Sequence, residues 1–371
     1  MIVLITNPLW QTYIFSALLL LALIISLRKR SDSEFFPISV SQELKGLAIL
    51  TIVFAHVAYA LVSDSSFLNP LSTMAGVGVN LFLLLSGYGL VISAIKKPLS
   101  IGQFYKRRLF NLYVPFWICL IIFFALDYYL LHLNYGLVYM LKSFLGLFTH
   151  ADLYLDVNAP FWYFSWIVMY YLMFPLLFIK RAPWLSAIFV YVVTFAIIQS
   201  QPHFLDQVIH LYRVHLIAFP LGMLLGYLLS NSAAWLKTKE FLSGAGNLQK
   251  TLRIGTGIAL LAAIFYFAKN SGVGQLAIIE ESVSIITCLL IIALFLIKRF
   301  EIKTFYWFGI FSYEIYMFHW PLMYRYDFLF RYLPAWLALA LYLAVFVALG
   351  WLLKTFIDYI TKISAKKSQI S

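Results

Sequence analysis

Charged side chains are scarce in this sequence. Asp, Glu, Lys and Arg together make up 11% of its 371 residues, whereas 63% of the residues are hydrophobic. A soluble globular protein carries about a quarter of its residues as charged side chains, so this composition excludes that class. No polar interval is long enough for a soluble domain. We therefore expect one integral membrane domain and no separate soluble one.

The sequence also lacks the motifs of several enzyme and transporter classes. It contains no Walker loop, dinucleotide-binding fingerprint, serine-hydrolase elbow or metal-ligand cluster, so ATP-driven transport and zinc chemistry lose support. Its two cysteines, Cys119 and Cys288, fall within apolar runs and indicate neither a disulfide nor a metal site. We predict that they are packing residues and that the protein binds no metal and no resident cofactor.

Long apolar runs are what the sequence has in abundance. No alternation typical of barrel strands is visible, and backbone groups inside a bilayer must be paired within each helix. We therefore predict an all-α polytopic membrane protein with about eleven transmembrane helices. The predicted segments are 9–27, 46–62, 74–95, 109–130, 161–179, 183–200, 211–229, 254–270, 275–297, 305–322 and 334–353.

The net charge of +12 follows from membrane topology and does not call for a nucleic-acid partner. If the N-terminus lies outside, 22 of the 27 lysines and arginines fall on the cytoplasmic side, as the positive-inside rule demands. We predict a multi-pass plasma-membrane protein with its C-terminus in the cytoplasm. The five remaining basic residues are Lys142, Arg213, Lys269, Arg325 and Arg331.

Three parts follow from this topology: an extra N-terminal transmembrane helix (1–30), a membrane domain (31–357) and a polar cytoplasmic tail (358–371). The basic cluster of the first part follows its apolar run instead of preceding it, so we expect a retained helix and not a signal peptide. Of the loops predicted outside, 131–160 is the long one, and its amphipathic stretch 136–148 is predicted to form a partial re-entrant or an interfacial helix.

The most informative stretch is ELKGLAILTIVFAHV, residues 43–57. His56 lies inside an apolar run, and Lys45 precedes it by eleven residues. Eleven residues make about three helical turns, so the two side chains share one helix face about 16 Å apart. An ionisable side chain at membrane depth is a candidate functional site. A desolvated, neutral imidazole can accept a proton, which predicts a general base at His56; the alternative is a structural interhelical hydrogen bond.

Two further groups of polar residues are open to two interpretations each. The cluster Lys106-Arg107-Arg108 and Lys45 suit the recognition of an anionic, phosphate-bearing ligand, or else they only anchor the cytoplasmic helix ends. Glu314 and His319 fall in the segment 305–322, where a carboxylate needs a partner or water and a histidine near the outer end is tolerated. We predict a catalytic role for Glu314 and a position that lines the cavity for His319.

The segment GVGVNLFLLLSGYGL, residues 76–90, brings small and polar residues into a transmembrane helix. Small residues permit close helix approach, which favours a packing role. The alternative is a locally loosened backbone that lines a cavity, with Asn80, Ser86 and Tyr88 exposed to it.

Five stretches, in this order, resemble the membrane acyltransferase 3 family. ELKGLAILTIVFAHV resembles its opening helix, in which an arginine is followed after ten residues by a histidine. GVGVNLFLLLSGYGL resembles its second helix, and FYKRRLFNLYVPFW resembles its basic segment. FWYFSWIVMYYLMFPLL and FGIFSYEIYMFHWPL are similar to its later motifs. The resemblance covers about residues 40 to 355.

The resemblance implies a bundle of about ten helices with both ends in the cytoplasm, preceded here by one leading helix. It further implies transfer of an acyl group, usually acetyl from acetyl-CoA as co-substrate, to a hydroxyl of a surface polysaccharide or lipid-linked glycan at the bacterial inner membrane. The family histidine corresponds to His56, and the phosphate-binding arginines correspond to Arg107 and Arg108. Lys45 replaces the family arginine, Asn111 stands where a further arginine often occurs, and Asn80 stands where aspartate is common.

Two other function classes remain open at this point. One is a proton-coupled secondary transporter that exports an anionic metabolite and uses His56, Glu314 and Asn80 as a proton relay. The other is a sensor or scaffold without turnover. No repeated half is visible, which counts against the transporter. For the enzyme, His56 acts either as general base or as a nucleophile that forms an acyl-imidazole. The sequence does not determine the acceptor sugar, the acyl group or the oligomeric state.

Overall fold

The structure is a computed structural model. It confirms the prediction of an all-α polytopic membrane protein. The described residues are 2–30, 36–98, 100–205, 207–231, 244, 246–271 and 277–367. The predicted loop with Lys237 and Lys239 lies outside these ranges. Within them, nine helices are long and apolar enough to cross a bilayer.

The helices and strands are named by their order along the chain. The longer helices are α1 (Pro8–Ile25), α2 (Ile38–His56), α3 (Ala75–Lys96), α4 (Ile101–Leu131), α6 (Trp162–Leu177), α7 (Pro183–Gln199), α9 (Ala218–Asn231), α11 (Asn247–Ala268), α12 (Ala277–Ile297) and α15 (Ala335–Lys367). The shorter ones are α5 (Leu137–Phe144), α8 (Ile209–Arg213), α13 (Lys303–Ile310) and α14 (Ser312–Trp320). Two π-helical turns, η1 (Val57–Leu61) and η5 (Pro321–Arg325), follow α2 and α14, and the 3-10 turns are η2 (Leu71–Met74), η3 (Ala159–Phe161) and η4 (His203–Leu205).

Three of the eleven predicted segments are short or interrupted. The segment 211–229 is divided between α8 and α9 by a turn at residues 214–217. The segment 183–200 forms α7, an apolar helix of 17 residues. The segment 305–322 is divided at Phe311, whose backbone angles (φ −106°, ψ 14°) interrupt the helix between α13 and α14. A short antiparallel pair, β1 (Leu27–Lys29) with β2 (Phe300–Ile302), was not expected from the apolar pattern. It joins the chain after α1 to the chain after α12.

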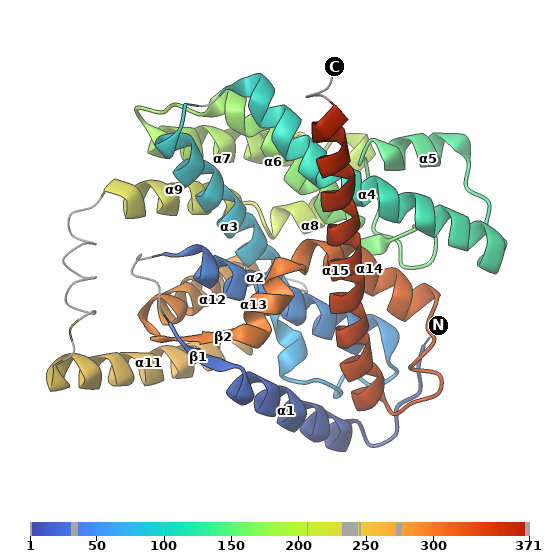
Figure 1. Ribbon diagram of the computed structural model, residues 1–371, viewed down its shortest axis with the longest axis horizontal. Coiled ribbons are helices and arrows are strands. Elements are labelled where there is room, and N and C mark those ends of the chain that lie inside the picture. The colour runs from blue at the N-terminus through green and yellow to red at the C-terminus, as the bar shows by residue number, and fades with distance from the viewer. Residues whose placement is uncertain are drawn as a thin grey trace.

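Helix α2 lies near the centre of the molecule, beside α3 and α13, whereas α1 and α11 lie at its periphery (Figure 1). Its N-terminal end is held by a buried ion pair. Lys298 Nζ donates to both carboxylate oxygens of Glu43, at 2.7 and 2.8 Å, and the Ile302 N–H donates to the same carboxylate at 2.5 Å. Glu43 is fully buried. A buried charge is tolerated only when it is paired in this way, so the pair fixes α2 against β2.

Glycine permits direct backbone contact between α2 and α13. A Cβ atom added to Gly46 would lie 1.8 Å from the carbonyl oxygen of Phe305, and one added to Gly309 would lie 1.8 Å from that of Gln42. No methyl group fits at either position unless the helices separate. The same two helices carry the chain into η1 and α14, so this contact also sets the geometry of the site described below.

We expect Gly46→Ala and Gly309→Ala each to lower the thermal unfolding temperature of the purified protein by several degrees. Overpacking of this kind costs about 1–3 kcal/mol, and the clash here is with backbone, which cannot rotate away. Gly89→Ala on α3 is the matched control, because nothing lies within 4 Å of a Cβ atom at that position. Equal unfolding temperatures for all three variants would contradict the close contact.

Candidate active site

His56 and His319 lie side by side, although 263 residues separate them in the chain. His56 Nδ1 is 2.8 Å from His319 Nε2. The ring planes differ by 4° and the ring centroids are 5.1 Å apart, so the hydrogen bond runs within the shared plane of the two rings. His319 is fully buried, whereas His56 is partly exposed and lines a pocket.

Backbone carbonyls fix the tautomers of this histidine pair. His319 Nδ1 is 3.0 Å from the carbonyl oxygen of Ile315 and 2.9 Å from that of Tyr316. A carbonyl oxygen can only accept a hydrogen bond, so Nδ1 of His319 carries the hydrogen. In the neutral ring Nε2 is then an acceptor, and it receives the hydrogen bond that His56 Nδ1 donates. Neutral His56 therefore has its free lone pair on Nε2.

Both histidines stand where an α-helix passes into a π-helical turn. His56 is the last residue of α2, directly before η1, and His319 is the second-last residue of α14, directly before Trp320 and η5. For η5 the cause is visible in the sequence, because Pro321 has no N–H to continue the α-helical hydrogen bonds. Single π-helical turns inside helices are frequent at functional sites.

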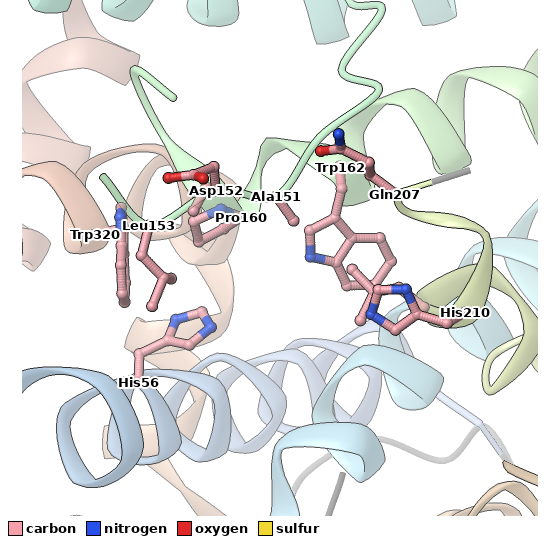
Figure 2. Close-up of a pocket in the computed structure, with 11 residues that line it drawn as sticks. His56, Ala151, Asp152, Leu153, Pro160, Trp162, Gln207, His210 and Trp320 are labelled. Atoms are coloured by element: carbon pink, nitrogen blue, oxygen red, sulfur yellow. The ribbon is translucent and has the colours of Figure 1, made fainter. Parts of the chain in front are cut away.

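A pocket of about 380 Å³ opens above His56 (Figure 2). Figure 2 shows the imidazole ring pointing into this pocket, with Trp320 on one side and Trp162 and His210 on the other. The indole ring of Trp320 meets the ring of His56 edge-on, with centroids 5.1 Å apart. A volume of this size is typical of sites that bind small molecules.

Two loops add polar residues to the pocket wall, beside His210 of α8. Asp152 lies in one of them, and Gln207 in the other. The N–H groups of Leu155 and Tyr154 donate to Asp152 Oδ1, at 2.9 and 2.7 Å, and these hydrogen bonds hold the pKa of that carboxyl below its ordinary value. Asp152 is therefore ionised at neutral pH. Both loops lie on the side that the charge distribution predicts to be outside.

The loop that carries Asp152 is attached to the helix of His319. Asn158 Nδ2 donates to the carbonyl oxygen of Met317 at 3.0 Å, and the Tyr316 hydroxyl donates to that of Pro160 at 2.9 Å. Met317 and Tyr316, the two residues of α14 in these hydrogen bonds, lie within three residues of His319. The pocket wall and the histidine pair thus form one connected unit.

The structure brings Lys45 and Arg108 together at the end of α2 that is predicted to be cytoplasmic. The positive charge of Arg108 is close enough to repel that of Lys45, and both side chains are partly buried. Neither makes an ion pair within the described ranges. Lys106 and Arg107 are exposed. Two adjacent cations without a carboxylate form a candidate site for an anion such as a phosphate.

The α2 face between Lys45 and His56 is covered by neighbouring helices. Ala48 and Ile52, which lie on this face, are buried. Gly78 of α3 packs against them, since a Cβ atom there would lie 2.6 Å from the carbonyl oxygen of Ala48 and 2.9 Å from Ile52 Cγ1. The residues that line the pocket above His56 do not include Lys45.

Glu314 does not lie beside His56. It stands five residues before His319 on α14, is buried, and is absent from the pocket lining. Its charged neighbours are Lys354 and Asp358 of α15. The structure thus places the second histidine, and not the carboxylate, next to His56.

Asn80, Ser86 and Tyr88 lie on one continuous helix, α3, so the backbone is not loosened there. Asn80 is fully buried; its Nδ2 donates to Ser284 Oγ at 2.8 Å, and its Oδ1 lies 2.8 Å from His215 Nδ1. Asn80 therefore links α3 to α12 and to the segment before α9. None of the three residues lines the pocket above His56.

Several pocket residues carried no signal that sequence reasoning could use. Gln207 and His210 belong to no motif. Trp162 lies in the motif FWYFSWIVMYYLMFPLL, but no spacing relates it to His56. Asp152 lies in the loop 131–160, which the sequence marked by its length and its amphipathic stretch. The histidine of the late motif FGIFSYEIYMFHWPL was the one partial signal for His319.

Comparison with known proteins gives one match. A family model described as an acyltransferase domain matches residues 44–355. This range contains the histidine pair, the pocket above it, and both Lys45 and Arg108. No match was found among curated proteins or among solved structures.

Proposed function

This chain belongs to the membrane acyltransferase 3 family, and from this premise we propose that it is an O-acyltransferase of the bacterial inner membrane. It takes an acyl group, in the first instance acetyl, from acyl-CoA on the cytoplasmic side. It transfers this group to a hydroxyl of a cell-surface polysaccharide or a lipid-linked glycan on the outer side. The observation that carries the proposal is a histidine lone pair of defined position at the floor of a pocket, whose loops lie on the side predicted to be outside.

The pocket suits a sugar. The indole rings of Trp162 and Trp320 line the pocket with apolar atoms, while Asp152, Gln207 and His210 offer acceptors and donors to the hydroxyl groups. An ionised carboxylate in such a wall binds hydroxyl donors strongly. This combination favours a polyhydroxylated acceptor over an apolar one.

The histidine pair supplies a general base. The acceptor hydroxyl gives its proton to His56 Nε2 as its oxygen attacks the thioester carbonyl carbon. The C–S bond then breaks, and the imidazolium of His56 returns the proton to the sulfur of coenzyme A. His319 is a positioning residue: it accepts the hydrogen bond from His56 Nδ1 and so keeps Nε2 directed at the acceptor.

The donor reaches this point from the other side of the membrane. Lys45 and Arg108 bind the phosphates of the nucleotide end, and the thin pantetheine arm extends toward His56 along α2, about 16 Å away. Because Ala48 and Ile52 are buried on that face, the arm enters only if α2 and α3 separate locally. Donor binding is therefore expected to be coupled to a helix movement.

Label transfer tests the proposal directly. Purified protein in lipid vesicles is given acyl-labelled acetyl-CoA and extracted surface glycan. We expect label on the glycan as an alkali-labile ester, together with one equivalent of free coenzyme A. Thioester consumption without glycan labelling, or uptake of the intact donor into the vesicles, would contradict an acyltransferase. The same assay separates the two roles of His56, because a ping-pong rate law would exclude direct transfer and favour an acyl-imidazole intermediate on Nε2.

We expect Arg108→Gln to raise the donor KM about tenfold and to leave the acceptor KM unchanged. A charge-assisted hydrogen bond to phosphate contributes about 1.5–3 kcal/mol, and partial exposure reduces this. Arg107→Gln should have a smaller effect, because Arg107 is exposed. Arg181→Gln, a further exposed arginine predicted to be cytoplasmic, is the control. Equal donor KM values for wild type and Arg108→Gln would remove Arg108 from the donor site.

A further inference from the structure

Arg213 differs from the other arginines on the side of the protein predicted to be outside. Arg325 pairs with Asp127, at 2.5 Å, and Arg331 Nε lies 3.8 Å from Asp327. Arg213 makes no ion pair within the described ranges and is exposed. Basic residues are few on this side of a membrane protein, so an arginine that lines a pocket and has no ion pair among the described residues points to an anionic ligand.

Arg213 lines a second pocket, of about 440 Å³. This pocket adjoins the one above His56, because His210 lines both. His210 and Arg213 are three residues apart on α8 and therefore share one face of that helix. In Figure 2, His210 stands across the first pocket from Trp320, which places the second pocket on the far side of the site.

Helix α8 is held firmly against the first pocket. Tyr212 is buried, and its ring stacks on that of Trp166 with centroids 4.1 Å apart and planes 6° apart. Its hydroxyl donates to the carbonyl oxygen of Trp162 at 3.4 Å. Trp162 in turn lines the pocket above His56. The backbone position of Arg213 is thus fixed relative to the catalytic pocket, although its side chain is exposed.

The described residues that line the two pockets carry opposite charges. Asp152 is a carboxylate in the first pocket, and Arg213 is a cation in the second. A neutral hydroxyl-bearing ring fits beside Asp152, whereas an acidic group is repelled there and attracted by Arg213. A ligand with both features can therefore lie in one orientation only.

We propose that the acceptor is an acidic glycan, whose carboxylate or phosphate binds Arg213 in the second pocket while a hydroxyl of the adjoining sugar reaches His56 in the first. This inference rests on the proposed acyltransferase function and adds the substrate class. Arg213 acts in acceptor recognition and takes no part in the chemistry.

The test compares matched acceptors in phosphatidylcholine vesicles. One pair is a uronic-acid oligosaccharide and its carboxyl-reduced neutral form, and the other is a glycosyl phosphate and its dephosphorylated form. We expect kcat/KM to be about 10- to 100-fold higher for the acidic member of at least one pair, and that pair identifies the anion. Arg213→Gln should remove this preference and leave kcat/KM for the neutral member and the donor KM unchanged.

Arg331→Gln is the control, because it removes an arginine from the same predicted side but not from either pocket lining. Equal rates for the acidic and neutral members of both pairs would overturn the inference and leave the acyltransferase proposal intact. Loss of the preference when phosphatidylglycerol replaces phosphatidylcholine would also overturn it, since Arg213 would then bind a lipid headgroup.

Saccharide binding measured by tryptophan fluorescence without acyl-CoA distinguishes the two proposals. Tighter binding of the acidic member, lost in Arg213→Gln, supports the acidic acceptor even where no acyl transfer is detected. Transfer without any difference in binding or rate between the members supports the enzyme and contradicts the role of Arg213.

Discussion

Replacement of His56 by glutamine is expected to reduce acyl transfer by about 10²- to 10⁴-fold, the range that a general base contributes. The glutamine amide can still donate a hydrogen bond to His319 Nε2, so the contact between α2 and α14 is retained. It offers no lone pair that takes a proton at neutral pH. The measurement is the initial rate of label transfer from acetyl-CoA to glycan at saturating concentrations of both substrates.

Two controls make this result specific to chemistry. The unfolding temperature and the affinity for acyl-CoA should match those of wild type, because neither Lys45 nor Arg108 is altered. His132→Asn replaces an exposed histidine at a position with φ 55°, which asparagine tolerates, and should keep full activity. Undiminished transfer by His56→Gln would exclude His56 as base and as nucleophile.

His319 should prove nearly as sensitive as His56, although it is sealed from the pocket. We expect His319→Leu to lower kcat about 10²-fold or more, because the Nδ1–H of His56 then loses its acceptor and the ring can present either nitrogen to the acceptor hydroxyl. The KM values for donor and acceptor should change little, since the ring of His319 contacts neither substrate. Single-turnover and steady-state rates of label transfer give this split between kcat and KM.

His319→Gln separates positioning from simple packing. The glutamine Oε1 atom can accept the hydrogen bond from His56 Nδ1, so this variant should recover part of the activity that leucine loses. Both variants should also be compared for unfolding temperature, because a buried polar group is replaced in each. Equal losses of kcat in His319→Gln and His319→Leu, at equal stability, would contradict the hydrogen-bonding role.

The transporter alternative predicts a different arrangement of the same residues. A proton relay through His56, Glu314 and Asn80 requires that they form one connected chain. In the structure, Asn80 binds His215 and Ser284, while Glu314 faces α15. His56 binds His319 instead. The observed contacts therefore support a site for group transfer more than a relay across the membrane.

The polytopic helical fold could be predicted from the sequence because the bilayer acts on each segment separately. Every span needs enough apolar residues and must pair its own backbone groups, and both requirements are visible in a single stretch. For this reason the pattern placed Lys45 and His56 on one helix, and α2 does contain both. It could not show the break at Phe311, because a helix interrupted by one residue keeps its apolar composition.

The sequence identified His56 but could not predict which residues surround it in the site. Nothing in the spacing of His56 and His319 indicates a contact across 263 residues, nor does any pattern connect His56 with Asp152, Gln207 or His210. Such contacts depend on how helices cross, and the crossing of α2 with α13 depends on Gly46 and Gly309 at one point of backbone contact.

The sequence by itself determined that this protein spans a membrane many times, that one apolar helix carries a lysine and, eleven residues later, a histidine, and that its motifs are those of acyltransferases. Each of these follows from residues close together in the chain. Only the tertiary structure decided which nitrogen of His56 keeps the lone pair and which side chains surround it. These depend on the directions of hydrogen bonds between helices that are distant in sequence, and such directions arise only when the helices pack.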